Sequence, residues 1–408
     1  MILGMWKRSP TEAPHRSTNV DLLTNKQMAY NANQINRAQT CEPKKNIVFL
    51  KTHKTGGSTI WWIMQNFALQ NKLQVVVPIT GLSFSDKSIT TNVVRRLFSP
   101  MGIRKGDYTN YKYNVFSIHA RFNRDVFDSF MKKNTTYVTI LRNPVTQFES
   151  AFDYFSIGGR KGNKTSRLRE WMEHPFLNWK KSKMKFATHN CQIRDLGINP
   201  SLLNANDIIT KIKKLDTDFD FVMITEMFDE SLIILKKMMC WRFEDIVYFP
   251  KKKRYSQVSL SKDLVLKIGN WNALDMKLYD YFRRRFDDHV KNYGPNFQSD
   301  LDAFRKIKSF LSNVCLSSFD SEKSGKSGNL IVSYNYNLNF TDVISTKDVV
   351  CKRVRPRLHK CNIGGSQIVS FDFSKLCYDL TLKPKEFIPR ILRNMMHKGN
   401  EVLGQREK

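Results

Sequence analysis

The 408-residue sequence lacks several features that would place it in a common class of protein. No apolar run is long enough to span a membrane, and the polar first 40 residues contain no signal-peptide core. The cysteines form no CxxC pair, and the group of Cys351, His359 and Cys361 lacks the spacing of a four-ligand zinc site. We therefore expect neither a membrane span nor a metal site in this chain.

The nucleotide-binding motif GxxxxGK[ST] is also absent. No acidic residue stands at the end of a predicted strand in a place that suits magnesium, which an enzyme acting on a nucleoside triphosphate needs. A nucleotide kinase is therefore an alternative, but the sequence lacks both the phosphate-binding motif and the magnesium ligand of such an enzyme.

The charge balance is strongly one-sided. The net charge of +30 favours anionic partners such as nucleic acid, a membrane surface, a phosphate compound or an acidic glycan. A basic nucleic-acid-binding protein is thus an alternative, but the sequence shows no RNP-like or helix-turn-helix signature. Hydrophobic residues make up 41% of the chain, which indicates a globular protein rather than a disordered one.

The number of cysteines bears on the cellular compartment. With seven cysteines, at least one thiol stays free or pairs between chains if the compartment is oxidising. Three possible N-glycosylation acceptors, at Asn134, Asn163 and Asn339, give a weak indication of a secretory route.

Apolar periodicity predicts alternating strands and helices. Strands are expected at 46–51, 74–77, 113–119, 137–141 and 219–224, and helices at 56–70, 125–132, 144–155 and 229–240. This alternation is typical of an α/β fold in which a central parallel β-sheet is flanked by helices.

The segment FLKTHKTGGST, residues 49–59, resembles a phosphate-binding loop between a strand and a helix. Free backbone N–H groups at a helix N-terminus favour an anion, and the glycines let the backbone approach it closely. However, Lys54 precedes the glycines, whereas the common nucleotide loop places its lysine after them. A metal-free site for 3′-phosphoadenosine-5′-phosphosulfate suits this order, because a sulfuryl group carries less charge than a γ-phosphoryl group. The alternative is an ordinary tight turn.

A second segment, YVTILRNPVTQFESAFDYF at 137–155, supports the same donor. A predicted strand ends at Arg142, and Ser150 follows in the next helix. An arginine fork and a serine hydroxyl can hold one phosphate together, which suits a donor with a separate 3′-phosphate.

In combination, FLKTHKTGGST and LRNPVTQFESAFDYF resemble the two donor-binding segments of Golgi sulfotransferases, and of the galactose 3-O-sulfotransferase family in particular. SIHARFN (117–123), DESLIILKKMMCW (229–241) and NWNALDMKLYDYF (270–282) agree in order. The likeness runs from about residue 44 to about residue 345. It implies a sulfotransferase fold similar to that of P-loop nucleoside triphosphate hydrolases. The expected domains are a polar, disordered leader (1–44), a catalytic domain (45–316), a linker or long loop (317–329) and a basic C-terminal extension (330–408).

The resemblance also implies roles for individual residues. The 5′-phosphosulfate would be held by Lys54, Thr55, Gly56, Gly57, Ser58 and Thr59. Arg142 and Ser150 would hold the 3′-phosphate, and no metal would be needed. The sulfuryl group would pass to the 3-hydroxyl of a terminal β-galactose.

A galactose hydroxyl is a poor nucleophile and needs a general base. Two histidines lie in the motifs, His119 at a strand end and His53 beside Lys54. We expect His119 to act as the base and His53 to orient it or to contact the acceptor, with the reverse assignment left open.

The acceptor implied by the family is a galactose-terminated glycolipid, most simply galactosylceramide, or alternatively a glycoprotein glycan with a terminal galactose. Loops around 81–112 and 156–190 would discriminate between them. The resemblance further implies the Golgi lumen, a nearby Golgi membrane surface, a possible homodimer and no nucleic-acid partner. Members of the family have an N-terminal type II membrane anchor, which this sequence does not contain.

Overall fold

A computed structural model describes the backbone of residues 41–76, 83–88, 112–159, 162–202, 207–249, 252–253, 259–323, 330–336, 343–346, 349–355, 358–363 and 367–371, together with a few positions between 377 and 393. The chain divides into two units, Met1–Glu42 and Pro43–Lys408. The helices and strands below belong to the second unit. The predicted leader at 1–44 lies almost entirely outside the described residues.

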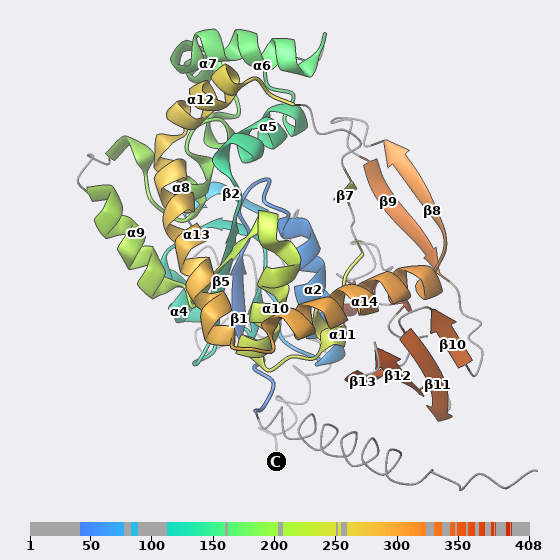
Figure 1. Ribbon diagram of the computed structural model, residues 1–408. Coiled ribbons are helices and arrows are strands. Elements are labelled where there is room, and N and C mark those ends of the chain that lie inside the picture. Colours follow the sequence, from blue (N-terminus) through green and yellow to red (C-terminus); the bar gives the residue numbers. More distant parts are fainter. Residues whose placement is uncertain are drawn as a thin grey trace, which may run out of the picture. The chain divides into compact units, whose positions relative to one another are not determined.

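The centre of the fold is a parallel sheet of four strands in the order β3-β1-β5-β6 (Figure 1). Its strands are β1 (Ile47–Leu50), β3 (Val115–Phe116), β5 (Thr136–Leu141) and β6 (Phe221–Ile224). Every residue of these strands is buried, as expected for short, β-branched and aromatic runs covered on both faces. The predicted α/β fold with a central parallel sheet is confirmed.

The four helices predicted at 56–70, 125–132, 144–155 and 229–240 are present, and the other helices of the described residues were not predicted. The helices are α2 (Gly57–Gln70), α4 (Arg124–Phe130), α5 (Pro144–Tyr154), α6 (Lys164–Glu173), α7 (Pro175–Lys181), α8 (Cys191–Asp195), α9 (Asp207–Asp218), α10 (Phe228–Met239), α11 (Phe243–Ile246), α12 (Lys262–Trp271), α13 (Ala273–Tyr293) and α14 (Phe297–Cys315). Short 3₁₀ turns occupy Lys185–Ala187, Pro200–Leu202 and Thr225–Met227. The strand expected at 74–77 is reduced to a single bridge at Val75.

Buried aromatic side chains join the helices to the sheet. Phe221 of β6 stacks on Phe286 of α13 with ring centroids 6.1 Å apart. Phe67 of α2 packs 4.1 Å from Trp241, which follows α10. Burying a large apolar side chain contributes about 1.5–3 kcal/mol, so such contacts fix the helices against the sheet.

The order of the strands creates a crevice for ligands. The chain passes from β1 through α2 to β3 on one side of β1, whereas β5 leads through α5 to β6 on the other side. The carboxyl ends of the neighbouring strands β1 and β5 therefore form a topological switch point, where α/β proteins bind their ligands. The segment Lys51–Gly56 and residue Arg142 lie at that point.

The remaining strands form smaller sheets. Antiparallel pairs join β7 (Lys252–Lys253) and β8 (Leu316–Lys323) to β9 (Leu330–Tyr336), and β10 (Val343–Thr346), β11 (Val349–Arg355), β12 (Leu358–Ile363) and β13 (Gln367–Phe371) form another sheet. A two-stranded sheet pairs β2 (Ser83–Ser88) with β4 (His119–Arg121). The first part of the segment 317–329, expected as a linker, is thus the strand β8, and residues 324–329 lie outside the described part.

The cysteines are largely oxidised. Cys315 and Cys377 form a disulfide, and Cys41, Cys240 and Cys361 are disulfide-bonded as well. Cys191 is a buried free thiol, which confirms that at least one cysteine stays unpaired.

The sequence predicts that the chain has no membrane span, and the helices of the structure can be compared with that prediction. Within the described ranges, no helix has both the length and the apolar character needed to cross a bilayer.

Candidate active site

The loop between β1 and α2 adopts a conformation that few residues tolerate. Lys54 has a φ of 63° and Gly56 a φ of 83°, both in the left-handed region. A Cβ atom on Gly57 would lie 2.7 Å from Cγ of Lys51, so a larger residue there would force the Lys51 side chain to move. A strained backbone at a lysine costs of order 1–3 kcal/mol, and such strain is characteristic of functional sites.

Threonine hydroxyls hold this loop in place. The hydroxyls of Thr52 and Thr55 lie 2.8 Å apart, and both residues are buried. From the next crossover, the Thr225 hydroxyl lies 2.7 Å from the carbonyl of Thr55 and 3.0 Å from that of Leu141. Thr225 therefore ties the ends of β1 and β5 together. The Thr55 hydroxyl therefore stabilises the loop itself, in addition to any contact that Thr55 makes with a ligand.

One face of α5 lies beside the same loop. Arg142 donates from Nη1 to the carbonyl of Lys54 at 3.2 Å and from Nε to the Thr146 hydroxyl at 3.0 Å. Ser150 and Tyr154 follow at four-residue intervals, so they share this helix face. The Nζ atom of Lys54 lies 3.7 Å from the ring centroid of Tyr154. The structure thus brings together the two motifs that the sequence singles out.

The short helix α8 fixes the position of Arg142. The Gln192 side chain accepts from the Arg142 N–H at 2.8 Å and donates to the Arg142 carbonyl at 2.8 Å. These two hydrogen bonds hold the backbone at the end of β5 without using its guanidinium group.

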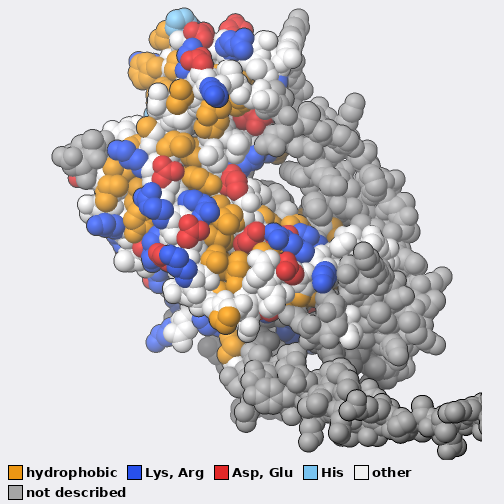
Figure 2. All heavy atoms as spheres, viewed as in Figure 1, with side chains coloured by type: hydrophobic (Ala, Val, Ile, Leu, Met, Phe, Trp, Pro, Cys, Tyr) orange, Lys and Arg blue, Asp and Glu red, His pale blue; other side chains and the backbone are white. Residues whose placement is uncertain are grey.

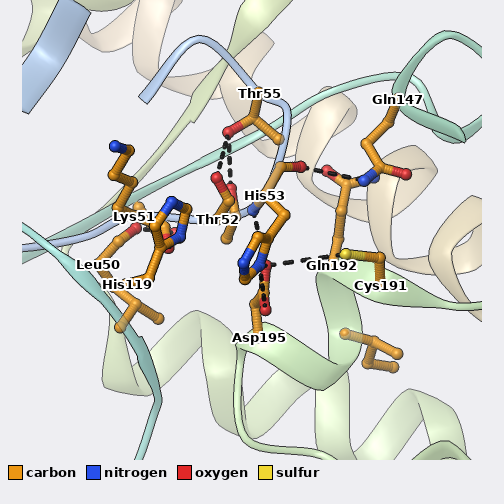
Figure 3. A network of polar contacts seen from close by, with 12 residues as sticks. Leu50, Lys51, Thr52, His53, Thr55, His119, Gln147, Cys191, Gln192 and Asp195 are labelled. Carbon is orange, nitrogen blue, oxygen red and sulfur yellow. Dashed lines mark hydrogen bonds and ion pairs between the residues drawn. The ribbon is translucent and has the colours of Figure 1, made fainter. Parts of the chain in front are cut away.

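The same helix provides the partner of His53 (Figure 3). The Nδ1 atom of His53 lies 2.9 Å from each carboxylate oxygen of Asp195, and the His53 N–H donates to Asp195 at 2.7 Å. Because a carboxylate only accepts, Nδ1 carries a proton, so the lone pair of the neutral imidazole is on Nε2. The imidazole is flanked by the ring of Phe186, 5.0 Å away, and by that of Phe155, 6.5 Å away.

His119 stacks directly on His53. The two rings are 4.2 Å apart and inclined by 16°. The Nδ1 atom of His119 donates to the carbonyl of Lys51 at 2.8 Å, which again leaves Nε2 with a lone pair. Burial, and next the positive charge of Lys51, hold the pKa of His119 well below its usual value. His119 is therefore neutral at physiological pH.

A free thiol lies behind the histidine pair. The Cys191 sulfur is 4.0 Å from Asp195, and burial raises the pKa of this thiol well above its usual value. His53, Cys191 and Asp195 offer three potential metal ligands within 4.8 Å of one another, although the sequence suggested no metal site. In the described structure, Asp195 and His53 already use the atoms that face each other to form hydrogen bonds.

A buried carboxylate anchors α8 from beneath. Asp275 accepts the N–H of Gln192 at 3.0 Å and that of Ile193 at 2.8 Å. In return, the Asn190 side chain accepts from the N–H of Asp275 at 3.1 Å. Burial raises the pKa of Asp275 to about 7, although the two donated hydrogen bonds act in the opposite direction. The N-termini of α8 and α13 thus cap each other.

The structure therefore gathers the predicted site residues Lys54, Thr55, Gly56, Gly57, His53, His119 and Arg142 around the carboxyl ends of β1 and β5. Ser58 and Thr59 lie in the first turn of α2, and Ser150 is buried on α5. Sequence reasoning missed Asp195, Gln192, Thr225 and Tyr154. The four-residue spacing from Ser150 would have found Tyr154, but no local signal marks the others.

Comparison with known proteins covers the same region. A family model described as galactose-3-O-sulfotransferase matches residues 14–326. The chain is 30% identical to galactosylceramide sulfotransferase of Homo sapiens over 289 residues, which are 68% of this chain and 66% of that protein. It is 28% identical to galactosylceramide sulfotransferase of Bos taurus over 291 residues, 68% of this chain and 65% of the relative. It is 29% identical to galactose-3-O-sulfotransferase 2 of Mus musculus over 285 residues, 67% of this chain and 70% of the relative.

The matched region thus spans only 65–66% of the length of the two galactosylceramide sulfotransferases. The family model nevertheless covers more than half of this chain, including the loop after β1, the start of α5 and the helix α8. On these grounds, the chain belongs to the galactose-3-O-sulfotransferase family.

Proposed function

We propose that this protein transfers the sulfuryl group of 3′-phosphoadenosine-5′-phosphosulfate to the 3-hydroxyl of a terminal galactose. The observation that supports this most is the meeting of three groups at one switch point: the Lys54 loop, the Arg142 face of α5 and the histidine pair. A cationic loop, an arginine fork and an oriented base are what such a transfer requires.

We assign the donor's 5′-phosphosulfate to Lys54, Thr55, Gly56, Gly57, Ser58 and Thr59. Gly56 caps α2, so the free N–H groups of its first turn suit a phosphate. Arg142 and Ser150 bind the 3′-phosphate in this proposal. The Thr146 hydroxyl, which lies between them on the same helix face, orients the guanidinium group.

The geometry leads us to propose His53 as the general base, with His119 beside it. Asp195 is hydrogen-bonded to Nδ1 of His53, so it both presents Nε2 and stabilises the imidazolium that forms when a proton arrives. His119 has no carboxylate among its described partners, and its lowered pKa makes it a poor proton acceptor. This exchanges the roles expected from sequence.

The bond changes of the proposed step balance as follows. His53 Nε2 takes the proton of the galactose 3-hydroxyl as its oxygen bonds to sulfur. The bond between sulfur and the bridging phosphate oxygen breaks, and adenosine 3′,5′-bisphosphate leaves. Lys54 neutralises the charge that builds on the bridging oxygen. One preorganised donor in such a position stabilises the transition state by about 3 kcal/mol.

We further propose that the acceptor is a glycolipid such as galactosylceramide and that the protein works in the Golgi lumen. One relative is named galactosylceramide sulfotransferase and another galactose-3-O-sulfotransferase 2. A glycoprotein glycan is therefore the alternative acceptor. The disulfide-bonded cysteines support an oxidising compartment.

A transfer assay with labelled donor tests the proposal. Galactosylceramide, lactose and a galactose-terminated N-glycan are offered side by side, each with and without EDTA. Label on a galactoside, undiminished by EDTA, is the expected result. No label on any galactoside would contradict the proposed reaction. Loss of activity in EDTA, restored by zinc, would instead make His53, Cys191 and Asp195 a metal site.

A further inference from the structure

The helix α7 exposes large apolar side chains that the fold does not cover. Phe176 is 52% exposed and Leu177 is 54% exposed, and no residue of α7 is buried. An exposed aliphatic or aromatic side chain is unremarkable when it stands alone. Here two large side chains are adjacent on one short helix, which indicates a contact surface.

The charge within α7 and the segment that follows it is basic, whereas α6 before it ends in the exposed Glu170 and Glu173. Between Pro175 and Asn190 the sequence contains Lys180, Lys181, Lys183 and Lys185, and it contains no acidic residue. The Nζ atom of Lys180 lies 4.4 Å from the ring centroid of Phe176, so a cation and an apolar side chain share the same surface. Figure 2 shows apolar, basic and acidic side chains side by side at the top of the view, where Figure 1 places α7 and α12.

We call this the α7 surface. It consists of Phe176, Leu177, Lys180, Lys181, Lys183 and Lys185. It is a fixed part of the fold. Asn178 of α7 donates to the carbonyl of Trp171 in α6 at 2.8 Å, and Trp171 is buried. The Trp179 indole donates to the carbonyl of Lys185 at 3.2 Å. These contacts tie α7 both to the helix behind it and to the segment that follows.

That following segment leads into the candidate active site. Phe186, five residues after the end of α7, places its ring 5.0 Å from that of His53. Five residues of extended chain reach at most about 18 Å, so the α7 surface and the catalytic histidine are near neighbours.

We propose that the α7 surface docks on the surface of an anionic lipid bilayer and thereby presents membrane-embedded galactolipid acceptors to His53. This inference rests on the proposed function for its acceptor. Aromatic and aliphatic side chains next to lysines are the composition of helices that lie in a membrane interface. A galactose linked directly to a lipid stands at the bilayer surface, so an enzyme acting on it needs its site close to a membrane-facing surface.

Charge complementarity favours a bilayer over a second copy of this chain. Each lysine near an anionic bilayer strengthens binding, whereas two α7 surfaces facing each other would bring eight lysines together. The nearby exposed side chains of α12, Val265 and Leu266, extend the apolar character of this part of the molecule. An ion pair of 3.1 Å between Lys267 and Glu173 links α12 to α6.

The experiment uses the full chain and the double variant Phe176→Ser with Leu177→Ser. Leu202→Ser with Ile209→Ser is the matched control, because these two exposed side chains (80% and 46%) lie outside the α7 surface. Co-sedimentation is measured with phosphatidylcholine vesicles that contain or lack phosphatidylserine. Transfer is measured on galactosylceramide in those vesicles and on soluble lactose.

The expected result is a loss of vesicle binding by about tenfold or more for the α7 variant, with a similar loss of transfer to galactosylceramide. Transfer to lactose is unchanged, and the control variant behaves as the wild type. A Lys180→Gln, Lys181→Gln variant loses the preference for phosphatidylserine.

Three outcomes would overturn the inference: vesicle binding that is unchanged in the α7 variant, an equal loss in the control, or an equal loss of transfer to lactose. Loss of a dimer in solution with vesicle binding intact would identify a second copy as the occupant instead. Failure of the proposed function is separate, because a wild-type protein that binds vesicles but sulfates no galactoside retains the docking surface and loses only the reaction.

Discussion

Both carboxylate oxygens of Asp195 lie 2.9 Å from the Nδ1 atom of His53. The two residues are 142 positions apart in the chain, and the contact exists because α8 packs against the loop after β1. A buried carboxylate in this position fixes the tautomer and the orientation of the histidine. It therefore distinguishes His53 from the stacked His119, whose described partner is a backbone carbonyl, and we propose His53 as the proton acceptor for this reason.

The first prediction concerns this pair. Asp195→Asn keeps an oxygen for the His53 N–H but removes the charge that stabilises the imidazolium. We expect kcat to fall by about 100-fold or more with little change in donor binding. Asp287→Asn, an exposed carboxylate paired with Arg283 on α13, is the control and should be silent.

A double-mutant cycle sharpens this test. If His53 is the base, Asp195→Asn should cost almost nothing further in a His53→Ala background, because the two residues act as one unit. Additive losses, together with a much larger effect of His119→Ala, would return the role of base to His119.

The second prediction concerns Lys54. Lys54→Ala removes the cation from the transfer site and should lower kcat by about 100-fold. Lys72→Ala is a matched control, since Lys72 is also a lysine with a positive φ of 50° and follows α2 at its far end. Circular dichroism verifies that both variants fold. Turnover near the wild-type rate in Lys54→Ala would refute the assignment of this loop.

The third prediction separates the two phosphate sites. Arg142→Lys loses the planar fork, so binding of adenosine 3′,5′-bisphosphate should weaken by about 10- to 100-fold. Binding of adenosine 5′-monophosphate, which has no 3′-phosphate, should change little. Calorimetry with both nucleotides measures the difference, with Arg283→Lys on the exposed face of α13 as the control. An equal loss for both nucleotides would show that Arg142 does not read the 3′-phosphate.

The fourth prediction is a dependence of stability on pH. The pKa of Asp275 is raised to about 7 in the fold from an ordinary value of 3.8, so the folded protein binds a proton that the unfolded chain releases. This carboxyl group therefore reduces the free energy of unfolding as pH rises from about 4 to about 7, by at most about 1.4 kcal/mol per pH unit.

Asp275→Asn removes that proton uptake and keeps one of the two oxygens that accept the N–H groups of Gln192 and Ile193. Denaturant titrations at several pH values between 5 and 8 should show that the wild type loses more stability than the variant as pH rises. Parallel curves would mean that Asp275 is already ionised throughout this range.

The sequence was sufficient to predict the central sheet and four of its helices, because the strands are short apolar runs and several of these helices begin at clear signals. Pro144 at the start of α5 and the glycines before α2 are examples. It also singled out Lys54 and Arg142, whose motifs carry local signatures and which the structure brings together. It did not predict Asp195 or Gln192, because α8 has only five residues and no apolar period. Their positions come from the packing of α8 on α13, which depends on the reciprocal caps between Asn190 and Asp275.

The most direct test of the account is the position of the sulfate on the product. The protein is incubated with labelled 3′-phosphoadenosine-5′-phosphosulfate and a β-galactoside, and the product is analysed by NMR. A 3-deoxygalactoside serves as the control acceptor. The account predicts sulfate on the 3-oxygen of galactose and no product from the control. Sulfate at another position, label on the control or no transfer to galactose would contradict it.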